Sequence, residues 1–227
     1  MGPPALQINS PAEGTVVKAG TEGFLINVTA NDDVGVKEFI VKVDGIVRDT
    51  INARENRVPS LRQNLRAMVF GTERRMITVV AKDNVDRTAE RSFFVYSDGD
   101  PPTISNIRPL PNAPGNSYKT TASRVGISAD ILDRGMAGVK EVRLIDISET
   151  RIFDTRTRPY EGNRYILEAI RPSGTGTRIQ QYYIQAFDKV GNMSRSDLIT
   201  IVWEEPGVEK KKEPIIPKQP AVKPPAR

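Results

Sequence analysis

Apolar and polar residues alternate in short stretches along most of this chain. Every second side chain is apolar within residues 24–30, 39–43 and 77–81. A period of two residues is typical of a β-strand that buries one face. No eleven-residue window carries a good helical stripe, so the pattern predicts an all-β protein.

The alternating pattern occurs twice. Residues 35–45 return as a near copy at 138–146, and residues 77–83 are matched by 182–188. A repeat of about a hundred residues predicts two domains, each long enough to bury a core. We therefore predict domains over residues 1–98 and 99–204. The boundary is placed at 97–102, which lacks apolar residues and holds two adjacent prolines.

Each copy contains six or seven predicted strands, and its longest connection is expected to cross between two sheets. In the first copy this connection is residues 52–66, a polar, arginine-bearing segment, with strand alternation resuming at 67–70. Strands of this spacing with one long crossover are typical of a Greek-key sandwich. The prediction is two tandem antiparallel β-sandwiches.

The composition changes in residues 205–227, which are rich in proline and lysine. Such a segment favours an extended tail or linker of polyproline type. Its only apolar anchors are Ile215, Ile216 and Val222. We expect the tail to connect the sandwiches to something downstream or to lie along a neighbouring subunit.

The residue inventory argues against catalysis. The chain has no cysteine and no histidine, which removes disulfides, thiolate nucleophiles, cysteine-bound zinc and the commonest general base. Catalytic motifs such as Gly-x-Ser-x-Gly or a phosphate loop are absent from the sequence. We predict that the protein is not an enzyme.

Several short motifs resemble the bacterial Ig-like domains that occur in tandem on surface and secreted proteins. In the second copy the motif is Ala-Phe-Asp-Lys-Val-Gly-Asn at 186–192, and in the first copy the motifs lie at 9–14, 30–36, 43–45 and 81–84. The resemblance implies Ig-like or fibronectin-III-like sandwiches over about residues 4–204. It implies little about function, because such sandwiches serve as spacers, adhesins, appendage parts and accessory modules of enzymes.

Acidic residues gather where the resemblance places the same end of each sandwich. Calcium needs several oxygen ligands that converge on one point, whereas Asp is also a common turn residue. No calcium-loop spacing is present, so we favour the turn interpretation and expect no cofactor and at most weak calcium binding. The candidate calcium ligands are Asp32, Asp33, Asp83, Asp86, Asp130, Asp133 and Asp188.

Arginines gather in the predicted crossover regions of both copies. They could hold an anionic polymer such as a surface polysaccharide, or pair with an acidic protein. Aromatic residues are sparse among them, so nucleic acid is not expected as a partner. We favour solvated loops with scattered ion pairs. The candidates are Arg54, Arg57, Arg62, Arg66, Arg151, Arg156, Arg158 and Arg164.

Two functional hypotheses follow. The first is a non-catalytic structural or interaction protein of a cell surface, periplasm, appendage or virion, with protein partners or self-assembly through sheet edges and the tail. The second is an accessory carbohydrate-contacting module of a larger secreted enzyme, which would need an exposed aromatic row from Tyr160, Tyr165, Tyr182 and Tyr183. The chain shows no apolar run of membrane-helix length, and its start lacks the apolar core of a signal peptide, so we expect either that a leader has been removed or that the protein is cytoplasmic.

Overall fold

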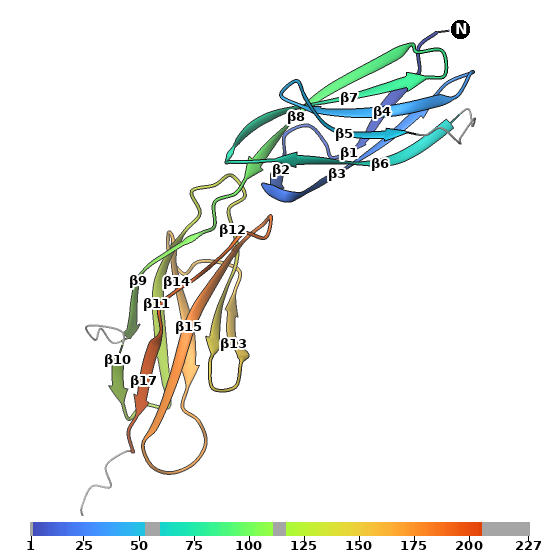
Figure 1. The fold of residues 1–227 in the computed structure, drawn as a ribbon. Coiled ribbons are helices and arrows are strands. Elements are labelled where there is room, and N and C mark those ends of the chain that lie inside the picture. Colours follow the sequence, from blue (N-terminus) through green and yellow to red (C-terminus); the bar gives the residue numbers. More distant parts are fainter. Residues whose placement is uncertain (1, 53–59, 111–116, 206–227) are drawn as a thin grey trace, which may run out of the picture.

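The computed structural model describes residues 2–52, 60–110 and 117–205, and every regular element in these ranges is a β-strand (Figure 1). The predicted all-β class is confirmed. Within the described part of the chain there is accordingly no helix long and apolar enough to cross a membrane. The predicted tail anchors and two of the candidate arginines, Arg54 and Arg57, lie outside the described residues.

The first module, residues 5–98, consists of two facing sheets. Its three-stranded sheet has the order β1 (Ala5–Ser10), β3 (Gly20–Asn31), β6 (Ser60–Val69). Its five-stranded sheet has the order β2 (Thr15–Lys18), β8 (Thr88–Asp98), β7 (Glu73–Asp83), β4 (Val36–Val43), β5 (Ile46–Asn52).

The second module, residues 103–203, repeats this arrangement. Its three-stranded sheet has the order β14 (Arg164–Ile170), β11 (Arg124–Leu132), β9 (Thr103–Leu110). Its larger sheet has the order β10 (Ser117–Thr120), β17 (Ile199–Trp203), β15 (Arg178–Asp188), β12 (Val139–Asp146), β13 (Arg151–Arg156), with β16 (Met193–Arg195) paired to β15.

Each sandwich is closed by the apolar faces that the alternation predicts. In the first module the inner side chains of β4 and β7 are fully buried, and in the second module so are their counterparts on β12 and β15. Strand β4 pairs with β7 and β12 pairs with β15, so the two repeated segments are direct neighbours. The buried residues at these positions are Phe39, Val41, Ile77, Val79, Val142, Leu144, Tyr182 and Ile184.

The predicted connection over residues 52–66 is wrong in its second half, because β6 begins at Ser60. Leu61 and Leu65 point inward, while Arg62 and Arg66 point outward. The outer face of this antiparallel sheet meets solvent, so it needs no apolar residues, and long polar side chains hide the alternation of the strand.

The sandwiches also contain parallel pairs, whereas the prediction was for antiparallel sheets. Strand β2 runs parallel to β8, and β10 runs parallel to β17. In the first module the chain pairs with one sheet as β1 and then crosses to the other sheet as β2. These crossing strands are only four residues long, too short for an alternation pattern to identify them.

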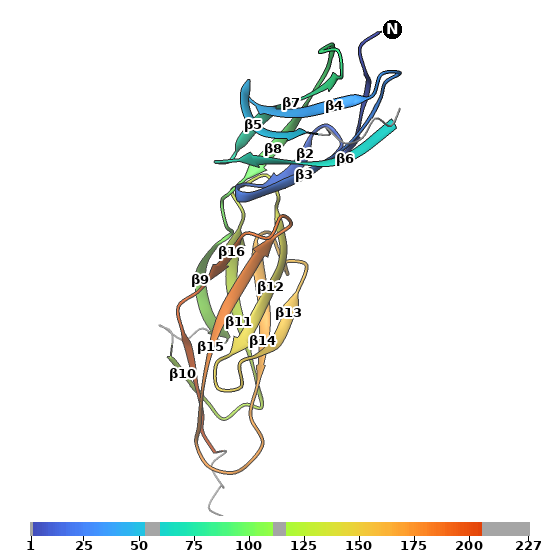
Figure 2. The same cartoon turned by 45° about the vertical axis from the view of Figure 1, so that its right-hand side comes forward.

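The two modules follow one another end to end and are joined by residues 99–102 (Figure 2). Both modules have the same orientation along the chain. Equivalent loops therefore lie away from the junction in the first module and at the junction in the second. The β3–β4 loop and the β7–β8 turn lie at the end of the first module that is farther from the second. Their counterparts, the β11–β12 loop and the β15–β16 turn, lie at the end of the second module that meets the first.

Candidate functional site

Three carboxylates converge where the two modules meet. Asp98 ends β8 of the first module, Asp133 begins the β11–β12 loop and Asp188 ends β15. Each of the three offers an oxygen atom that lies within 4.8 Å of the others. We call this set the junction acids. Among the ion pairs of the described residues, none involves a junction acid.

Asp98 joins the modules directly and is completely buried. Its Oδ2 accepts a hydrogen bond of 2.8 Å from the backbone N–H of Ala137, and its backbone carbonyl accepts one of 3.0 Å from Nδ2 of Asn192. A third bond between the modules runs from Nζ of Lys18 to the carbonyl of Gly191, at 3.4 Å. The base of the first module is therefore bonded to both loops at the top of the second.

Asp188 is also completely buried, and it organises the β15–β16 turn. Its Oδ1 accepts hydrogen bonds from the backbone N–H groups of Val190 and Asn192, and its Oδ2 accepts one of 2.7 Å from Nδ2 of Asn192. The Asn192 amide thus bridges the second module's own turn and the carbonyl of Asp98.

Asp133 is less well satisfied than its neighbours. Its Oδ1 accepts a 2.9 Å bond from the N–H of Gly135, but its Oδ2 is buried and accepts no hydrogen bond. Burial raises the pKa of the Asp133 carboxyl, and the negative charges of Asp98 and Asp188 raise it further, whereas the backbone N–H groups of Gly135 and Gly138 oppose this rise. The three carboxylates concentrate negative charge at the junction, where they accept hydrogen bonds from neutral backbone and amide N–H groups.

At the far end of the first module, the charge of the corresponding turn is balanced by an arginine. Asp83 takes the place of Asp188, and the N–H of Arg87 donates to its Oδ1 as the N–H of Asn192 does in the second module. Nε of Arg87 donates to Oδ2 of Asp83 at 2.6 Å, and the same guanidinium lies 3.9 Å from Asp33. A cationic side chain therefore occupies the position that Asn192 holds at the junction.

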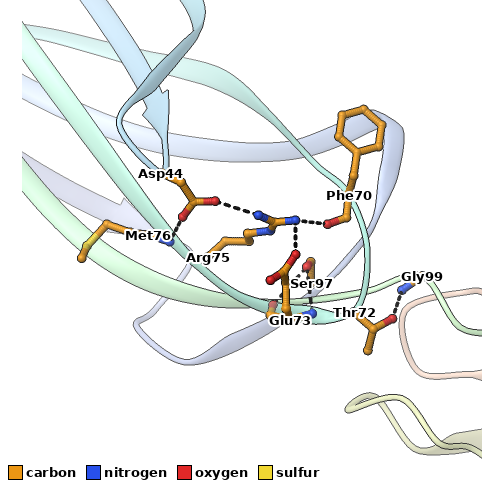
Figure 3. A network of polar contacts seen from close by, with 8 residues as sticks. All are labelled: Asp44, Phe70, Thr72, Glu73, Arg75, Met76, Ser97 and Gly99. Atoms are coloured by element: carbon orange, nitrogen blue, oxygen red, sulfur yellow. Dashed lines mark hydrogen bonds and ion pairs between the residues drawn. The ribbon is translucent and has the colours of Figure 1, made fainter.

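A network of charged groups braces the base of the first module beside Asp98 (Figure 3). The guanidinium of Arg75 donates to Oδ2 of Asp44 and to the carbonyl of Phe70, and it pairs with Glu73. Burial would raise the pKa of Asp44, but the N–H of Met76 and the Arg75 guanidinium outweigh burial and lower it. The turn after β4 and the turn after β6 are thereby fixed to one another.

The same brace reaches the linker. Oγ of Ser97, the residue before Asp98, donates to the carbonyl of Glu73, and the N–H of Gly99, the residue after Asp98, donates to Oγ1 of Thr72. Asp98 is thus held on both sides by the turn between β6 and β7. A carboxylate placed in this way needs little reordering to make a bond with the second module.

The remaining predicted acidic candidates do not join the junction acids. Asp130 lies on β11, where it accepts a hydrogen bond from Asn106 and pairs with Arg164 at 3.5 Å. Asp32 accepts the N–H of Val34 in a turn, and Asp86 pairs with Lys37 and Lys82. Sequence reasoning missed Asp98 because it was assigned to the linker. The only feature of the sequence that could have indicated Asp98 is its position at the end of a strand with alternating polarity.

The candidate arginines that lie within the described residues do not form one stripe. Arg62 and Arg66 lie on the outer face of β6, where they bond to Asn27 and to the carbonyl of Glu22. The second-module candidates divide between the two sheets, with Arg151 and Arg156 on β13 and Arg164 on β14. Each of these three lies beside a carboxylate, which is the arrangement of scattered ion pairs. Arg158 is exposed in the turn between those strands.

The four tyrosines named for carbohydrate contact do not form an exposed row. Tyr182 and Tyr165 are buried in the core of the second module. Tyr183 lies beneath the guanidinium of Arg195, 3.7 Å from its ring centre, and Tyr160 is exposed in a turn. Among the described residues, the fold brings the predicted candidates Asp133 and Asp188 together with Asp98, which was not predicted.

No family model matches the chain, and no curated protein matches it. Among solved structures it is similar to the fibronectin(III)-like modules of Clostridium thermocellum CbhA, with 15% identity, a TM-score of 0.45, and coverage of 88% of this chain and 95% of that one. It is also similar to the FN1–FN3 domains of chicken CNTN1, with 12% identity, a TM-score of 0.46, and coverage of 90% and 66%.

A further similar structure comes from a 1.5-MDa bacterial ice-binding adhesin, with 12% identity, a TM-score of 0.39, and coverage of 90% of this chain and 65% of that one. Tandem Ig-like and fibronectin-III-like modules recur among the similar structures. All of these TM-scores lie below 0.5, so the strand order described above defines the fold.

Proposed function

We propose that this chain is a non-catalytic spacer, in which two β-sandwiches are held in a fixed relative orientation so that surfaces at their far ends are presented at a set distance. The observation that carries the proposal is the burial of Asp98 between the modules. Its carboxylate and its carbonyl are each bonded to a different loop of the second module. A flexible connection would leave these groups in water.

The length of the linker supports the same interpretation. Only residues 99–102 separate β8 from β9, and they include two adjacent prolines that restrict the backbone. Pro102 is itself buried. A short, proline-containing and partly buried linker limits rotation between modules far more than a glycine-rich one.

We place this spacer on a cell surface, in the periplasm or in an extracellular appendage, because its motifs at 186–192 resemble those of bacterial surface Ig-like domains. Partners would be proteins, or further copies of the chain, that contact sheet edges or the tail. An anionic surface polysaccharide is a less favoured partner, since the arginines are dispersed and paired.

The orientation of the modules can be measured directly because the chain has no cysteine. Spin labels at Thr50→Cys on β5 and Thr155→Cys on β13, both at exposed positions, report the distance between the modules. We expect a single narrow distance distribution. Insertion of four Gly/Ser residues after Asp100 provides the matched flexible control. A wild-type distribution as broad as that of the control would contradict the spacer proposal.

A further inference from the structure

We propose that the outer face of the three-stranded sheet in the second module binds a neutral saccharide, with the ring of Tyr160 as the platform for one sugar. Two adjoining hollows lie on this face, with volumes of about 280 Å³ and 460 Å³, and Arg164 lines both. We call the one beside Tyr160 the aromatic hollow and the one beside Asp130 the polar hollow. All of their residues belong to the second module, so the inference goes beyond the spacer proposal and does not rest on it.

The floor of the aromatic hollow is formed by a small outward residue of β11. Alternate residues from 125 to 131 are buried in the core, so Ser128 and Asp130 face outward. Arg108 of β9 and Ile166 of β14 lie opposite Ser128 on its two sides. These longer side chains cover the serine, which is only 4% exposed although it faces outward. A short residue between two long ones gives the open face of the sheet a furrow.

Tyr160 forms one wall of this hollow and is held there by its backbone. Its N–H donates a 2.7 Å hydrogen bond to the carbonyl of Arg164, and the N–H of Arg164 donates one of 2.8 Å to the carbonyl of Glu161. These bonds close a tight turn before β14, in which Gly162 adopts a positive φ of 55°. The tyrosine is nevertheless 74% exposed. An aromatic residue that is fixed by its backbone and open to solvent can contact a ligand at little cost in ordering.

The polar hollow is built on a bulge in β9. The register between β9 and β11 shifts between Ser128 and Asp130, and Asn106, within this shift, has a φ of 50°. Nδ2 of Asn106 donates a 2.8 Å hydrogen bond to Oδ2 of Asp130, whose Oδ1 lies 3.5 Å from Nε of Arg164. Bulges re-aim side chains and are over-represented beside functional sites. An amide, a carboxylate and a guanidinium therefore lie side by side on the outer face.

This mixture of donors and acceptors selects the ligand. A carboxylate only accepts hydrogen bonds, a guanidinium only donates them, and an amide does both. An anionic ligand would be repelled by the carboxylates, and a cationic ligand by the guanidinium groups. Neighbouring hydroxyl groups both donate and accept, so they can satisfy all three side chains. The charged residues that line the two hollows carry no net charge in total, since they are two arginines and two acids, Arg108, Arg164, Asp130 and Glu161.

A sugar chain also matches the change in character from one hollow to the next. A sugar ring has apolar C–H faces and a rim of hydroxyl groups. In the aromatic hollow Leu110 and Ile166 lie with Tyr160, so a C–H face can pack there while the rim and the next sugar reach the polar hollow past Arg164. A peptide strand is a poorer occupant, because β11 is paired on both sides and the hollows offer no free strand edge for main-chain hydrogen bonds.

The test titrates the whole chain with neutral hexasaccharides of glucose, mannose, galactose, xylose and N-acetylglucosamine, and with hexagalacturonate as the acidic counterpart. We expect calorimetry to show saturable binding of at least one neutral hexasaccharide at or below about 5 mM. Changes in amide NMR shifts should concentrate on β9, β11 and β14. The proposal would be overturned if no neutral hexasaccharide bound in this range, or if hexagalacturonate bound more tightly than all of them.

Single substitutions locate the site. Tyr160→Ala should weaken binding by about tenfold or more, whereas Tyr160→Phe keeps the ring and should stay within about twofold of the wild type. Asn106→Gly removes the amide but still allows the positive φ, and it should weaken binding by about fivefold. Tyr183→Ala is the matched control, because Tyr183 lies beneath Arg195 on the outer face of the other sheet. Binding that is unchanged in Tyr160→Ala, or lost equally in Tyr183→Ala, would overturn the proposal.

Two further measurements keep the outcomes distinct. Because Tyr160 is exposed, Tyr160→Ala should leave the melting temperature unchanged, so that a loss of binding is not a loss of folding. The spin-label distances are measured without saccharide and test the spacer alone. A broad distance distribution together with binding that depends on Tyr160 contradicts the spacer and retains the saccharide site. A narrow distribution without saccharide binding retains the spacer and overturns the saccharide site.

Discussion

Gly135 of the β11–β12 loop lies directly against the carboxylate of Asp98, so closely that a Cβ atom at position 135 would overlap both carboxylate oxygens. The contact crosses between modules, because Asp98 belongs to the first and Gly135 to the second. A residue without a side chain is thus required where the carboxylate enters the loop. This requirement comes from close approach rather than from an unusual backbone conformation.

The first prediction follows from that contact. Gly135→Ala should displace the Asp98 carboxylate and lower the free energy of unfolding by about 1–3 kcal/mol, the usual cost of overpacking. It should also broaden the distance distribution between spin labels at positions 50 and 155. Gly126→Ala is the control, because its new methyl group would meet only the side chains of Leu110 and Ile166, at 3.4 Å or more. Equal effects from the two variants would show that the junction contact is unimportant.

The second prediction concerns the cores. Val41→Ala and Ile184→Ala each remove fully buried methyl groups and should each destabilise their own module by about 2–4 kcal/mol. Denaturant unfolding followed by fluorescence, together with thermal unfolding followed by calorimetry, measures the loss of stability. The controls are Val47→Ala and Ile179→Ala, whose side chains are 54% and 67% exposed. If the buried and exposed variants lost equal stability, the assigned strand faces would be incorrect.

The third prediction concerns the sole tryptophan. Nε1 of Trp203 donates a 2.9 Å hydrogen bond to Oε1 of Gln180, which also accepts the hydroxyl of Tyr182, while Nε2 of Gln180 donates to Asp146. All four residues are buried. Gln180→Leu keeps the approximate volume but leaves three buried polar groups without this partner. It should destabilise the second module by about 2–4 kcal/mol.

Trp203 fluorescence measures this loss directly, because no other tryptophan is present in the chain. Gln181→Leu on the exposed side of the same strand is the matched control and should change stability little. A Gln180→Leu variant as stable as this control would show that the network adds nothing. Burial raises the pKa of the Tyr182 phenol, so its hydroxyl stays a hydrogen-bond donor in ordinary buffers.

The features that local alternation controls could be predicted from the sequence. The inward faces of Val41 and Ile184 follow from a period of two, which needs no knowledge of the partner strand. Asp133 and Asp188 were expected at the same end of the sandwich because the resemblance to bacterial Ig-like domains places their turns there. The buried position of Trp203 was not predicted, since it depends on the pairing of β15 with β17 and on a distant glutamine.

The most important acid was not predicted for a similar reason. The role of Asp98 exists only because two modules meet, and no pattern within one module shows which loop the next module presents. The balancing role of Arg87 was also missed, because an arginine in a turn looks the same whether it faces water or a buried carboxylate. Contacts between distant segments decide both cases, and one sequence shows no such contacts.

The last prediction concerns acid sensitivity of the first module. Burial by itself would raise the pKa of Asp83, but the N–H and guanidinium of Arg87 and the N–H of Val85 outweigh it and lower the pKa. A carboxyl whose pKa is lowered by folding stabilises the native state at every pH above its unfolded value, about 3.9. That contribution is lost as the pH falls from about 4 through the lower native pKa.

Asp83→Asn should therefore destabilise the first module at neutral pH and reduce the loss of stability between about pH 4 and pH 2. Denaturant titrations across this range, with calorimetry to separate the modules, provide the measurement. Glu90→Gln is the control for removing one negative charge, because Glu90 lies on the exposed face of β8, 3.8 Å from Lys42. If the wild type and Asp83→Asn lost stability in parallel over this range, the Arg87 contact would not be what lowers the pKa of Asp83. The contrast between the Asp83–Arg87 turn and the Asp188–Asn192 turn would then lose its basis.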